Sequence, residues 1–339
     1  MSDESRSASE PPPVNDARLP ETEFTRLVGC ALPIQQAPVG YPAADPALAA
    51  AVAAAGAHGM LAAVRMAAEE LSRALDALNS RTRAYGVNLI QAILDQEAFE
   101  VAAEKAPLVE LYIGEPDPTL IERIHSGGAL ACRQVISADE ARVAQEEGCD
   151  LLVARSIEAG GRAKGGVGMI PLLDSVLEAV DLPVVAAGGV GSGRGVAAAL
   201  AAGAAGVRLG TRFLAAEEAR THPVYLDALL AARTEDTALT EAFSVDGPPS
   251  PHRVLRSALE AASVYDGEVV GEMHIFGQRR QVRRFSADNP ADTATGRIEA
   301  MALYAGESVG AVREVQPAGE IVAEVATEAG ELLRRLAAG

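Results

Sequence analysis

Residues 182–213 read LPVVAAGGVGSGRGVAAALAAGAAGVRLGTRF, and this stretch decides the fold. It begins with an apolar run at 183–187 that has the character of a buried strand, and five of the next eight residues are glycines. Residues 192–202 have the composition of a helix, and a second buried strand is predicted at 207–209. The stretch is therefore predicted to be a strand–helix–strand unit with a glycine-containing turn after each strand.

The glycines after the first of these strands are compatible with more than one fold. In a (β/α)8 barrel, the loops after the last two strands commonly hold a phosphate group, and glycines let the backbone approach it. A Rossmann dinucleotide turn is the rival, but the third glycine of G-x-G-x-x-G falls at Arg194, and no acidic residue ends the next strand. In a third interpretation the glycines only tighten turns.

The rest of the chain repeats the same alternation of strand and helix. Strands are expected at 32–38, 58–64, 85–90, 108–114, 129–135, 151–157, 183–187 and 207–209, and helices at 45–55, 67–79, 97–105, 118–125, 138–147, 172–180 and 192–202. Strands that alternate with helices pair in parallel, and eight such units close a barrel. The predicted fold class is therefore α/β, a (β/α)8 TIM barrel with a helical C-terminal cap region.

Composition divides the chain into four parts. Residues 1–23 are rich in Ser, Pro and acidic residues, so a disordered leader is expected there. The barrel is expected to occupy 24–213, and the segment 214–315 reads as helices and loops that form a cap and substrate region. Residues 316–339 are expected to form a closing helix that packs on the barrel.

The net charge of -18 argues against nucleic acid and anionic membrane surfaces as partners, because both are polyanions. No apolar run is long enough to span a membrane, and the N-terminus lacks the pattern of a secretion signal. Cys30, Cys132 and Cys149 are scattered and form no C-x-x-C pair, which suits a reducing cytoplasm. No spacing of histidines or acidic residues in the sequence indicates a metal site. A cytoplasmic location is expected, and the oligomeric state is left open.

Several pieces of the chain carry a family resemblance. They are LPIQQAPVG (32–40), AAGAHGML (54–61), YGVNL (85–89), SIEAGG (156–161), the long piece 182–219 and LYAGESVG (303–310). Together they resemble the nitronate monooxygenase family, also called 2-nitropropane dioxygenase, and its related enoyl reductases and quinone reductases. The resemblance implies an FMN cofactor in a TIM barrel and covers nearly the whole chain after residue 23.

The resemblance also implies which residues contact FMN. The expected cofactor-binding residues are Ala37, Pro38, Val39, Asn88, Gln134, Gly160, Gly161, Gly188, Gly189, Gly210 and Thr211. Of these, Gly188 and Gly189 would hold the phosphate from one side, and Gly210 and Thr211 from the other. Backbone N–H groups and one hydroxyl suit a phosphate dianion.

The chain departs from the family pattern at the catalytic position. The family loop usually contains a histidine that handles the substrate's α-proton, whereas this chain has Arg162. Arginine is always protonated and is no general base under ordinary conditions, but its planar fork fits a carboxylate or nitronate. We therefore expect weak or no activity on neutral nitroalkanes, while anionic substrates remain possible. The alternative to an anion-binding role is that Arg162 is a solvated loop cation without a function in the site.

The remaining histidines are not convincing replacements for the missing one. His58 is expected at the amino end of a strand, while His125 and His222 read as residues at helix ends. His252 and His274 lie in the cap segment, which would fold over the site, but contact with a substrate is expected for neither of them.

The function predicted from these observations is oxidation of an alkyl nitronate, or a similar small-molecule anion, with O2 to a carbonyl compound and nitrite. The first alternative is an NAD(P)H-dependent flavin reductase of a quinone or enoyl thioester. The second is a flavin-binding protein that has lost catalysis together with its histidine.

Overall fold

The computed structural model describes residues 19–162, 165–247 and 249–338. Its eight-stranded parallel sheet has the order β1-β9-β8-β6-β5-β4-β3-β2. The strands are β1 (Ile34–Gln36), β2 (Gly59–Ala62), β3 (Tyr85–Ile90), β4 (Leu108–Tyr112), β5 (Leu130–Val135), β6 (Leu151–Arg155), β8 (Val184–Ala187) and β9 (Gly206–Leu209). A parallel bridge between Gln35 and His58 joins the first strand to the last in this order. The predicted TIM barrel is confirmed.

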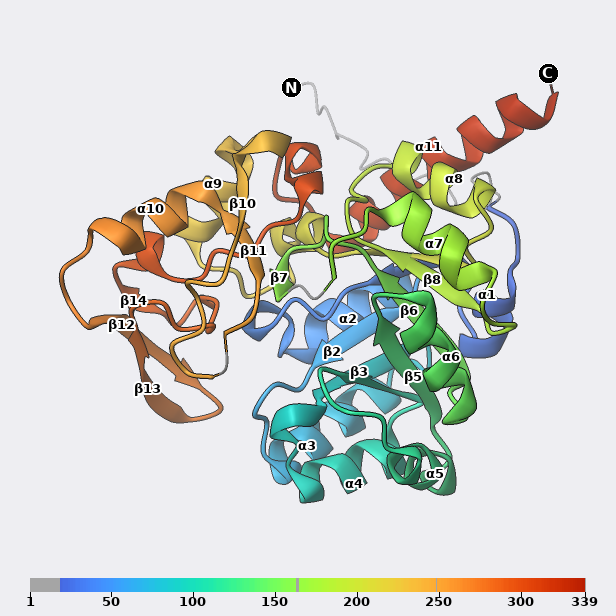
Figure 1. Ribbon diagram of the computed structural model, residues 1–339, viewed down its shortest axis with the longest axis horizontal. Coiled ribbons are helices and arrows are strands. Elements are labelled where there is room, and N and C mark those ends of the chain that lie inside the picture. The colour runs from blue at the N-terminus through green and yellow to red at the C-terminus, as the bar shows by residue number, and fades with distance from the viewer. Residues whose placement is uncertain (1–18, 163–164, 248, 339) are drawn as a thin grey trace, which may run out of the picture.

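Five of the seven barrel helices begin where the sequence supplies a capping side chain. Asp45, Asp95, Asp117, Ser137 and Ser192 each accept a hydrogen bond from a backbone N–H group in the first turn of the helix that follows. The helices of the barrel are α2 (Pro46–Ala54), α3 (Ala68–Asn79), α4 (Gln96–Lys105), α5 (Pro118–Gly127), α6 (Ala138–Glu146), α7 (Met169–Leu177) and α8 (Gly193–Ala201). All seven helices lie within a few residues of their expected bounds. Figure 1 shows the strands β2, β3, β5, β6 and β8 of the sheet with the helices α3 to α8 on its outside.

The amino-terminal end of the barrel is filled by α1 (Glu23–Val28). Phe24 of this helix is fully buried and packs with Met60, Leu108 and Leu151 inside the barrel. The ring of Phe24 also contacts the imidazole of His58 edge-on, with 5.7 Å between centroids. Because apolar side chains close this end within the described residues, the carboxyl ends of the strands are the open end at which a ligand can enter.

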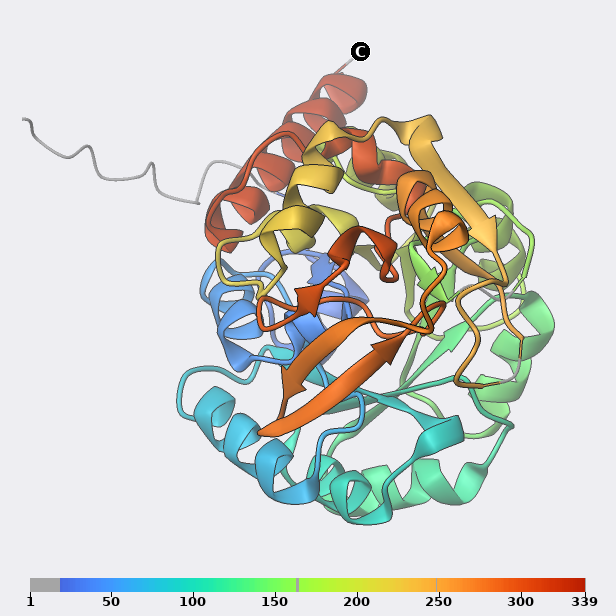
Figure 2. The same ribbon diagram turned by 90° about the vertical axis from the view of Figure 1, so that its left-hand side faces the viewer.

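Residues 214–315 lie over that carboxyl end and contain strands as well as the expected helices. The helices are α9 (Pro223–Ala231) and α10 (Arg256–Val264), and the strands are β10 (Thr237–Thr240), β11 (His252–Leu255), β12 (Val269–Ile275), β13 (Gln278–Arg283) and β14 (Thr295–Gly296). Figure 2 shows the β12–β13 hairpin across the face of the ring of helices. None of these strands was expected, and β13 shows why for one of them: it reads QRRQVR, a polar run without the apolar signal of a buried strand.

The chain ends in α11 (Ala318–Ala338), at the position expected for the closing helix. Its buried face includes Ile321, Val325 and Ala329. The helix lies against α8, and a Cβ at Gly193 would be 2.6 Å from the carbonyl oxygen of Val325. The absence of a side chain at Gly193 therefore lets the two helices approach closely.

Most of the expected leader, residues 1–18, lies outside the described residues. Its last part is ordered, because the Thr22 side chain caps α1 and donates a hydrogen bond to the Ala205 carbonyl oxygen (2.6 Å). Among the described helices, none combines the length and apolar character needed to cross a membrane. The cytoplasmic location stays a prediction.

His58 makes a testable contribution to stability. Burial and, second, the nearby charge of Arg208 lower the pKa of His58 to about 3. A histidine in the unfolded chain has a pKa of about 6.5. Below pH 6.5 the His58 imidazole therefore binds a proton in the unfolded chain but not in the folded one. The contribution of His58 to the free energy of unfolding is therefore complete above pH 6.5 and falls by about 2 kcal/mol between pH 6.5 and pH 5. Urea unfolding at both pH values should show this loss in the wild type and a smaller one in H58Q; equal losses would contradict it.

Candidate active site

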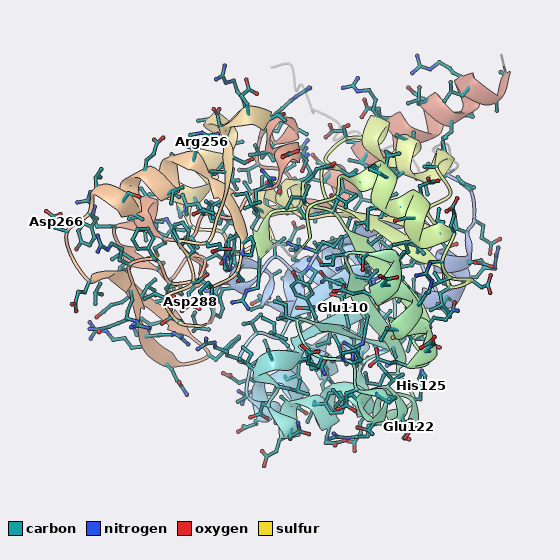
Figure 3. All side chains as sticks on the ribbon, in the orientation of Figure 1. Glu110, Glu122, His125, Arg256, Asp266 and Asp288 are labelled. Atoms are coloured by element: carbon teal, nitrogen blue, oxygen red, sulfur yellow. The ribbon has the colours of Figure 1, made fainter. Side chains whose placement is uncertain are left out.

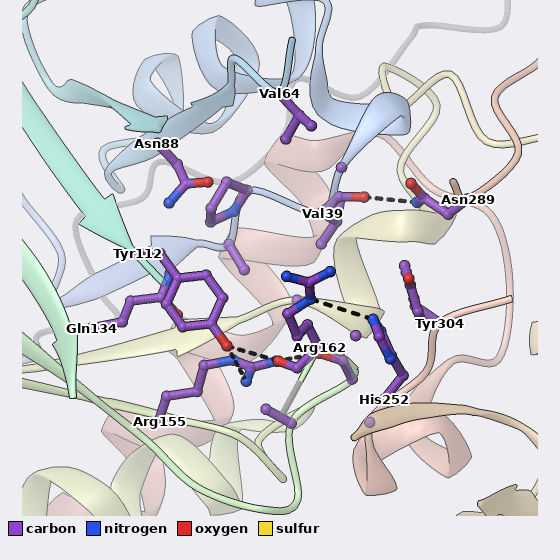
Figure 4. Close-up of a pocket in the computed structure, with 18 of the residues that line it drawn as sticks. Val39, Val64, Asn88, Tyr112, Gln134, Arg155, Arg162, His252, Asn289 and Tyr304 are labelled. Carbon is purple, nitrogen blue, oxygen red and sulfur yellow. Dashed lines mark hydrogen bonds between the residues drawn. The ribbon is translucent and has the colours of Figure 1, made fainter. Parts of the chain in front are cut away.

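One cavity of about 520 Å³ opens at the carboxyl ends of the strands, beneath the cap. The loops that follow the barrel strands form its floor, and Asp246, Gly247, His252 and the segments 287–289 and 304–308 form its upper wall. It brings together Arg162 and every residue expected from the sequence to contact the cofactor, namely Ala37, Pro38, Val39, Asn88, Gln134, Gly160, Gly161, Gly188, Gly189, Gly210 and Thr211. Figure 4 shows part of this cavity.

Two glycines keep the cavity open. Gly161 has a φ of 79°, and a Cβ there would extend between Arg155 and Tyr304, 3.8 Å from a guanidinium nitrogen and 3.9 Å from the tyrosine ring. Gly210 has an ordinary φ, and a Cβ there would lie 3.3 Å from the Cβ of Ala37 and 3.6 Å from Cγ1 of Val39. A larger side chain at either position would take space from a ligand on the floor.

The floor also has donors suited to a phosphate. Gly188 and Gly189 both have positive φ values, 105° and 73°, which are conformations that L-residues with side chains rarely adopt. Across the cavity, the Thr211 hydroxyl accepts a hydrogen bond from the Gly306 N–H (2.9 Å), so its own proton is left to donate. Backbone amides and a hydroxyl proton are neutral donors of the kind that fits a phosphate dianion, and the phosphate site expected from the sequence stays a prediction.

A buried ion pair lies inside the barrel below this floor. The Glu110 carboxylate on β4 accepts a hydrogen bond from the Arg208 guanidinium on β9. It also accepts hydrogen bonds from the side-chain amides of Asn88 (2.8 Å) and Gln134 (2.7 Å). Figure 3 shows Glu110 within the barrel, whereas the labelled Glu122 and His125 lie at its periphery. Because both amide nitrogens donate to Glu110, the amide oxygens of Asn88 and Gln134 are available to accept from a ligand.

Arg162 lies on β7 (Gly161–Arg162), which pairs with β11 of the cap. Its guanidinium extends into the cavity, and its Nε donates to Nε2 of His252 at 3.4 Å (Figure 4). His252 is the direct cross-strand partner of Arg162. The cation at this position is therefore part of the cavity wall and is held by a residue from the cap.

Two further side chains hold the backbone of the Arg162 loop. The Tyr112 hydroxyl donates to the Arg162 carbonyl oxygen (2.8 Å), and burial raises the pKa of Tyr112, so the hydroxyl keeps its proton. Arg155 donates through Nη1 to the Tyr112 hydroxyl (3.0 Å) and through Nη2 to the Gly160 carbonyl oxygen (2.6 Å). Since two nitrogens of the Arg155 guanidinium are engaged in this way, Arg162 is better placed than Arg155 to bind an anion.

Comparison with known proteins gives the family. A family model described as "Nitronate monooxygenase" matches residues 82–328. This chain belongs to the nitronate monooxygenase family. The family consists of flavin enzymes, so the chain is a flavin-dependent oxidoreductase. The family resemblance found in the sequence is confirmed.

Three members or neighbours illustrate the range of related proteins. A (3aS,4S,5R,7aS)-5-hydroxy-7a-methyl-1-oxo-octahydro-1H-indene-4-carboxyl-CoA dehydrogenase of Rhodococcus jostii is 35% identical over 268 residues, which cover 78% of this chain and 73% of the relative. The structure of FabK from Thermotoga maritima is 28% identical with a TM-score of 0.76, covering 94% of this chain and 99% of that one. Nitroalkane oxidase from Streptomyces ansochromogenes is 29% identical with a TM-score of 0.73, covering 92% and 99%.

The histidines of this nitronate monooxygenase family member do not supply an exposed base to the cavity. His58 is buried within the barrel, His125 pairs with Asp150 on the surface, and His222 caps α9. His274 lines a different cavity, beside α3. His252 reaches the main cavity wall, but its side chain has no exposed surface.

Sequence reasoning missed several residues that shape the site. Glu110 and Arg208 were counted within apolar strands, although a charge in the middle of LVELY and of VRL is the signal that marks them. Tyr112 and Arg155 end their strands and carried no motif.

Among the described residues, no group of three or more His, Cys, Asp or Glu side chains could hold a metal ion.

Proposed function

We propose that this protein is an FMN-dependent oxidoreductase that oxidises a small organic anion, for which an alkyl nitronate is the first candidate. The observation that supports the proposal is the Arg162 guanidinium, which extends over a glycine-lined floor suited to a phosphate-bearing cofactor. O2 is the proposed electron acceptor, and a carbonyl compound and nitrite are the proposed products.

The roles of the residues follow from their positions. When bound, FMN would take electrons from the substrate and pass them to O2. The Gly188–Gly189 amides and the Thr211 hydroxyl would hold its phosphate, and the amide oxygens of Asn88 and Gln134 would accept from its polar groups. Arg162 would bind the substrate anion through its planar fork and orient the reacting carbon over the cofactor.

The structure supports a preference for substrates that are already ionised. Deprotonation of a neutral nitroalkane needs a base that reaches the substrate, and the Nε2 lone pair of His252 is both covered and engaged by Arg162. We therefore predict that preformed ethylnitronate is turned over at least about 100-fold faster than neutral nitroethane at pH 7. Initial rates of O2 consumption measure both. Comparable rates would contradict the prediction and would indicate a base outside this set of histidines.

The main test is an anaerobic titration of the flavin-loaded protein with ethylnitronate, followed by the visible absorbance of the flavin. We expect the absorbance to decrease in the wild type, and the concentration required to increase at least about 10-fold in R162M. R162K retains the charge without the planar fork, so an intermediate value is expected. An R162M titration identical to that of the wild type would contradict the role of Arg162.

A second candidate function is the dehydrogenation or reduction of an acyl thioester. The observation that favours it is the relative named as a CoA dehydrogenase, which matches 78% of this chain at 35% identity. The enolate of a thioester is also a delocalised oxyanion, so the Arg162 fork fits it by the same chemistry. Loss of flavin absorbance with a saturated acyl-CoA, or with NADH or NADPH, and none with ethylnitronate would favour this candidate. No change with any of them would indicate a flavin-binding protein without catalysis.

A further inference from the structure

The guanidinium of Arg162 is held along one edge only. Within the described residues, its side-chain hydrogen bond is the one from Nε to Nε2 of His252, at 3.4 Å. Figure 4 shows the other two guanidinium nitrogens directed away from His252 and into the cavity. The Nη1–Nη2 edge is one of the two edges that bind a planar anion in a bidentate manner, and it is the edge left for a ligand.

His252 can only accept at the nitrogen that faces Arg162. Its Nδ1 lies 2.8 Å from the Ser250 carbonyl oxygen, and a carbonyl oxygen only accepts, so Nδ1 carries the ring proton. Burial and, second, the charge of Arg162 lower the pKa of His252 to about 4, with a smaller contribution from Arg155. The imidazole is therefore neutral at pH 7, and its Nε2 lone pair is the acceptor for the guanidinium.

The ring of His252 is packed on all sides. It stacks on the ring of Tyr304, with centroids 5.7 Å apart and planes 10° apart, and has no exposed surface. The Tyr304 hydroxyl in turn donates to the Ala287 carbonyl oxygen at 2.7 Å. A hydrogen bond of 3.4 Å is long, so its main effect is to direct the guanidinium, while the buried, stacked ring supplies a wall behind it.

We infer that His252 is a positioning residue that points the Nη1–Nη2 edge of Arg162 at the substrate anion. The inference rests on the proposed anion-binding role of Arg162. The backbone of Arg162 is separately held by Tyr112 and by strand pairing with β11, so His252 contributes the orientation of the side chain. A cap residue would in this way determine how a cation on the barrel loop meets its ligand.

The test compares two variants of His252 in the flavin-loaded protein. H252F keeps a flat ring against Tyr304 but has no acceptor, whereas H252Q keeps an acceptor. Nitrate is the probe, because it is a planar, unreactive anion with the same oxygen edge as a nitronate, and calorimetry gives its Kd. We expect the Kd to increase about 10-fold in H252F and to stay within about threefold of the wild type in H252Q. R162M is expected to abolish measurable binding.

Steady-state kinetics with ethylnitronate give a second measurement that a purely structural role would not reproduce. Weaker ground-state binding predicts a higher KM in H252F with little change in kcat, and recovery of KM in H252Q. Thermal melting and flavin content establish that each variant folds. A comparison of H252L with H252Q replaces the first pair in the case that H252F does not fold.

The outcomes separate this inference from the proposed function. Wild-type nitrate affinity in H252F, together with lost binding in R162M, would overturn the positioning role of His252 and leave the proposed role of Arg162 intact. Unchanged nitrate binding and nitronate turnover in R162M would overturn the role of Arg162, and the inference on His252 with it. An H252Q variant as weak as H252F would also overturn the inference, because an acceptor at this position would then have no effect.

Discussion

Replacement of Arg208 by methionine is expected to reduce the free energy of unfolding by about 3–5 kcal/mol. The variant removes one partner of an ion pair that lies inside the barrel, where the Arg208 side chain is 4% exposed and that of Glu110 is 0% exposed. Methionine fills much of the same volume, so the loss arises from charge and not from a cavity. Chemical denaturation measures it.

The expected loss of stability follows from the hydrogen bonds that Glu110 would keep in R208M. In R208M its carboxylate would still accept from Asn88 and Gln134, but these neutral amides do not compensate a buried negative charge. Gln35 would also lose the hydrogen bond that its side-chain oxygen accepts from Arg208 Nε (2.7 Å). An unpaired buried charge costs more than the pair contributes, which is why removal of one partner is severe.

Two further variants make the test specific. The double variant R208M/E110Q removes both charges and should be more stable than R208M alone, by at least about 1 kcal/mol. The control is R73M, which breaks the Arg73–Glu69 pair on the surface of α3, where the side chains are 66% and 84% exposed; we expect a change within about 0.5 kcal/mol. An R208M variant as stable as R73M would mean that the interior charge is compensated by water or by a bound group.

The barrel could be predicted from the sequence because each of its strands is a local signal. Runs such as YGVNLI at 85–90 are mostly apolar, lie between Arg83 and Gln91, and become β3 with the same bounds. Caps such as Asp45 and Ser192 stand one residue before the helices that they begin. Parallel pairing and closure then follow from the regular alternation, because few other arrangements bury eight such strands.

The residues that complete the site could not be predicted in the same way. The Arg162–His252 contact joins positions 90 apart in the chain, and it depends on a short strand in the cap that has no sequence signature. The network around Glu110 depends on which side chains of β3, β4, β5 and β9 point into the barrel at one level. Such contacts are tertiary, so a single sequence shows the residue types but not their partners.

Replacement of Gly210 by valine is expected to reduce the flavin content of the purified protein about 10-fold or more. Gly210 follows β9 and begins the 3-10 helix Thr211–Ala215, with an ordinary backbone φ of -111°, so a side chain there causes no backbone strain. Its Cβ would lie 3.3 Å from Ala37 and 3.6 Å from Val39, and the two methyl groups of valine would extend further toward these cavity residues. The ratio of flavin absorbance to protein absorbance measures the effect.

A graded series shows whether space on the cavity floor controls flavin binding. Alanine adds only the Cβ, a tight but tolerable contact at 3.3 Å, so G210A should retain most of the flavin and G210V little. The control is G319A on α11, where the added Cβ would lie 3.8 Å from Ala55 and far from the cavity, and flavin content should stay at the wild-type value. The melting temperature of G210V should match that of flavin-free wild-type protein. A fully flavin-loaded G210V would place the flavin elsewhere and would remove the basis for assigning Gly210 and Thr211 to its phosphate. A stepwise loss of flavin from glycine to alanine to valine, in contrast, requires the cofactor to lie against this floor.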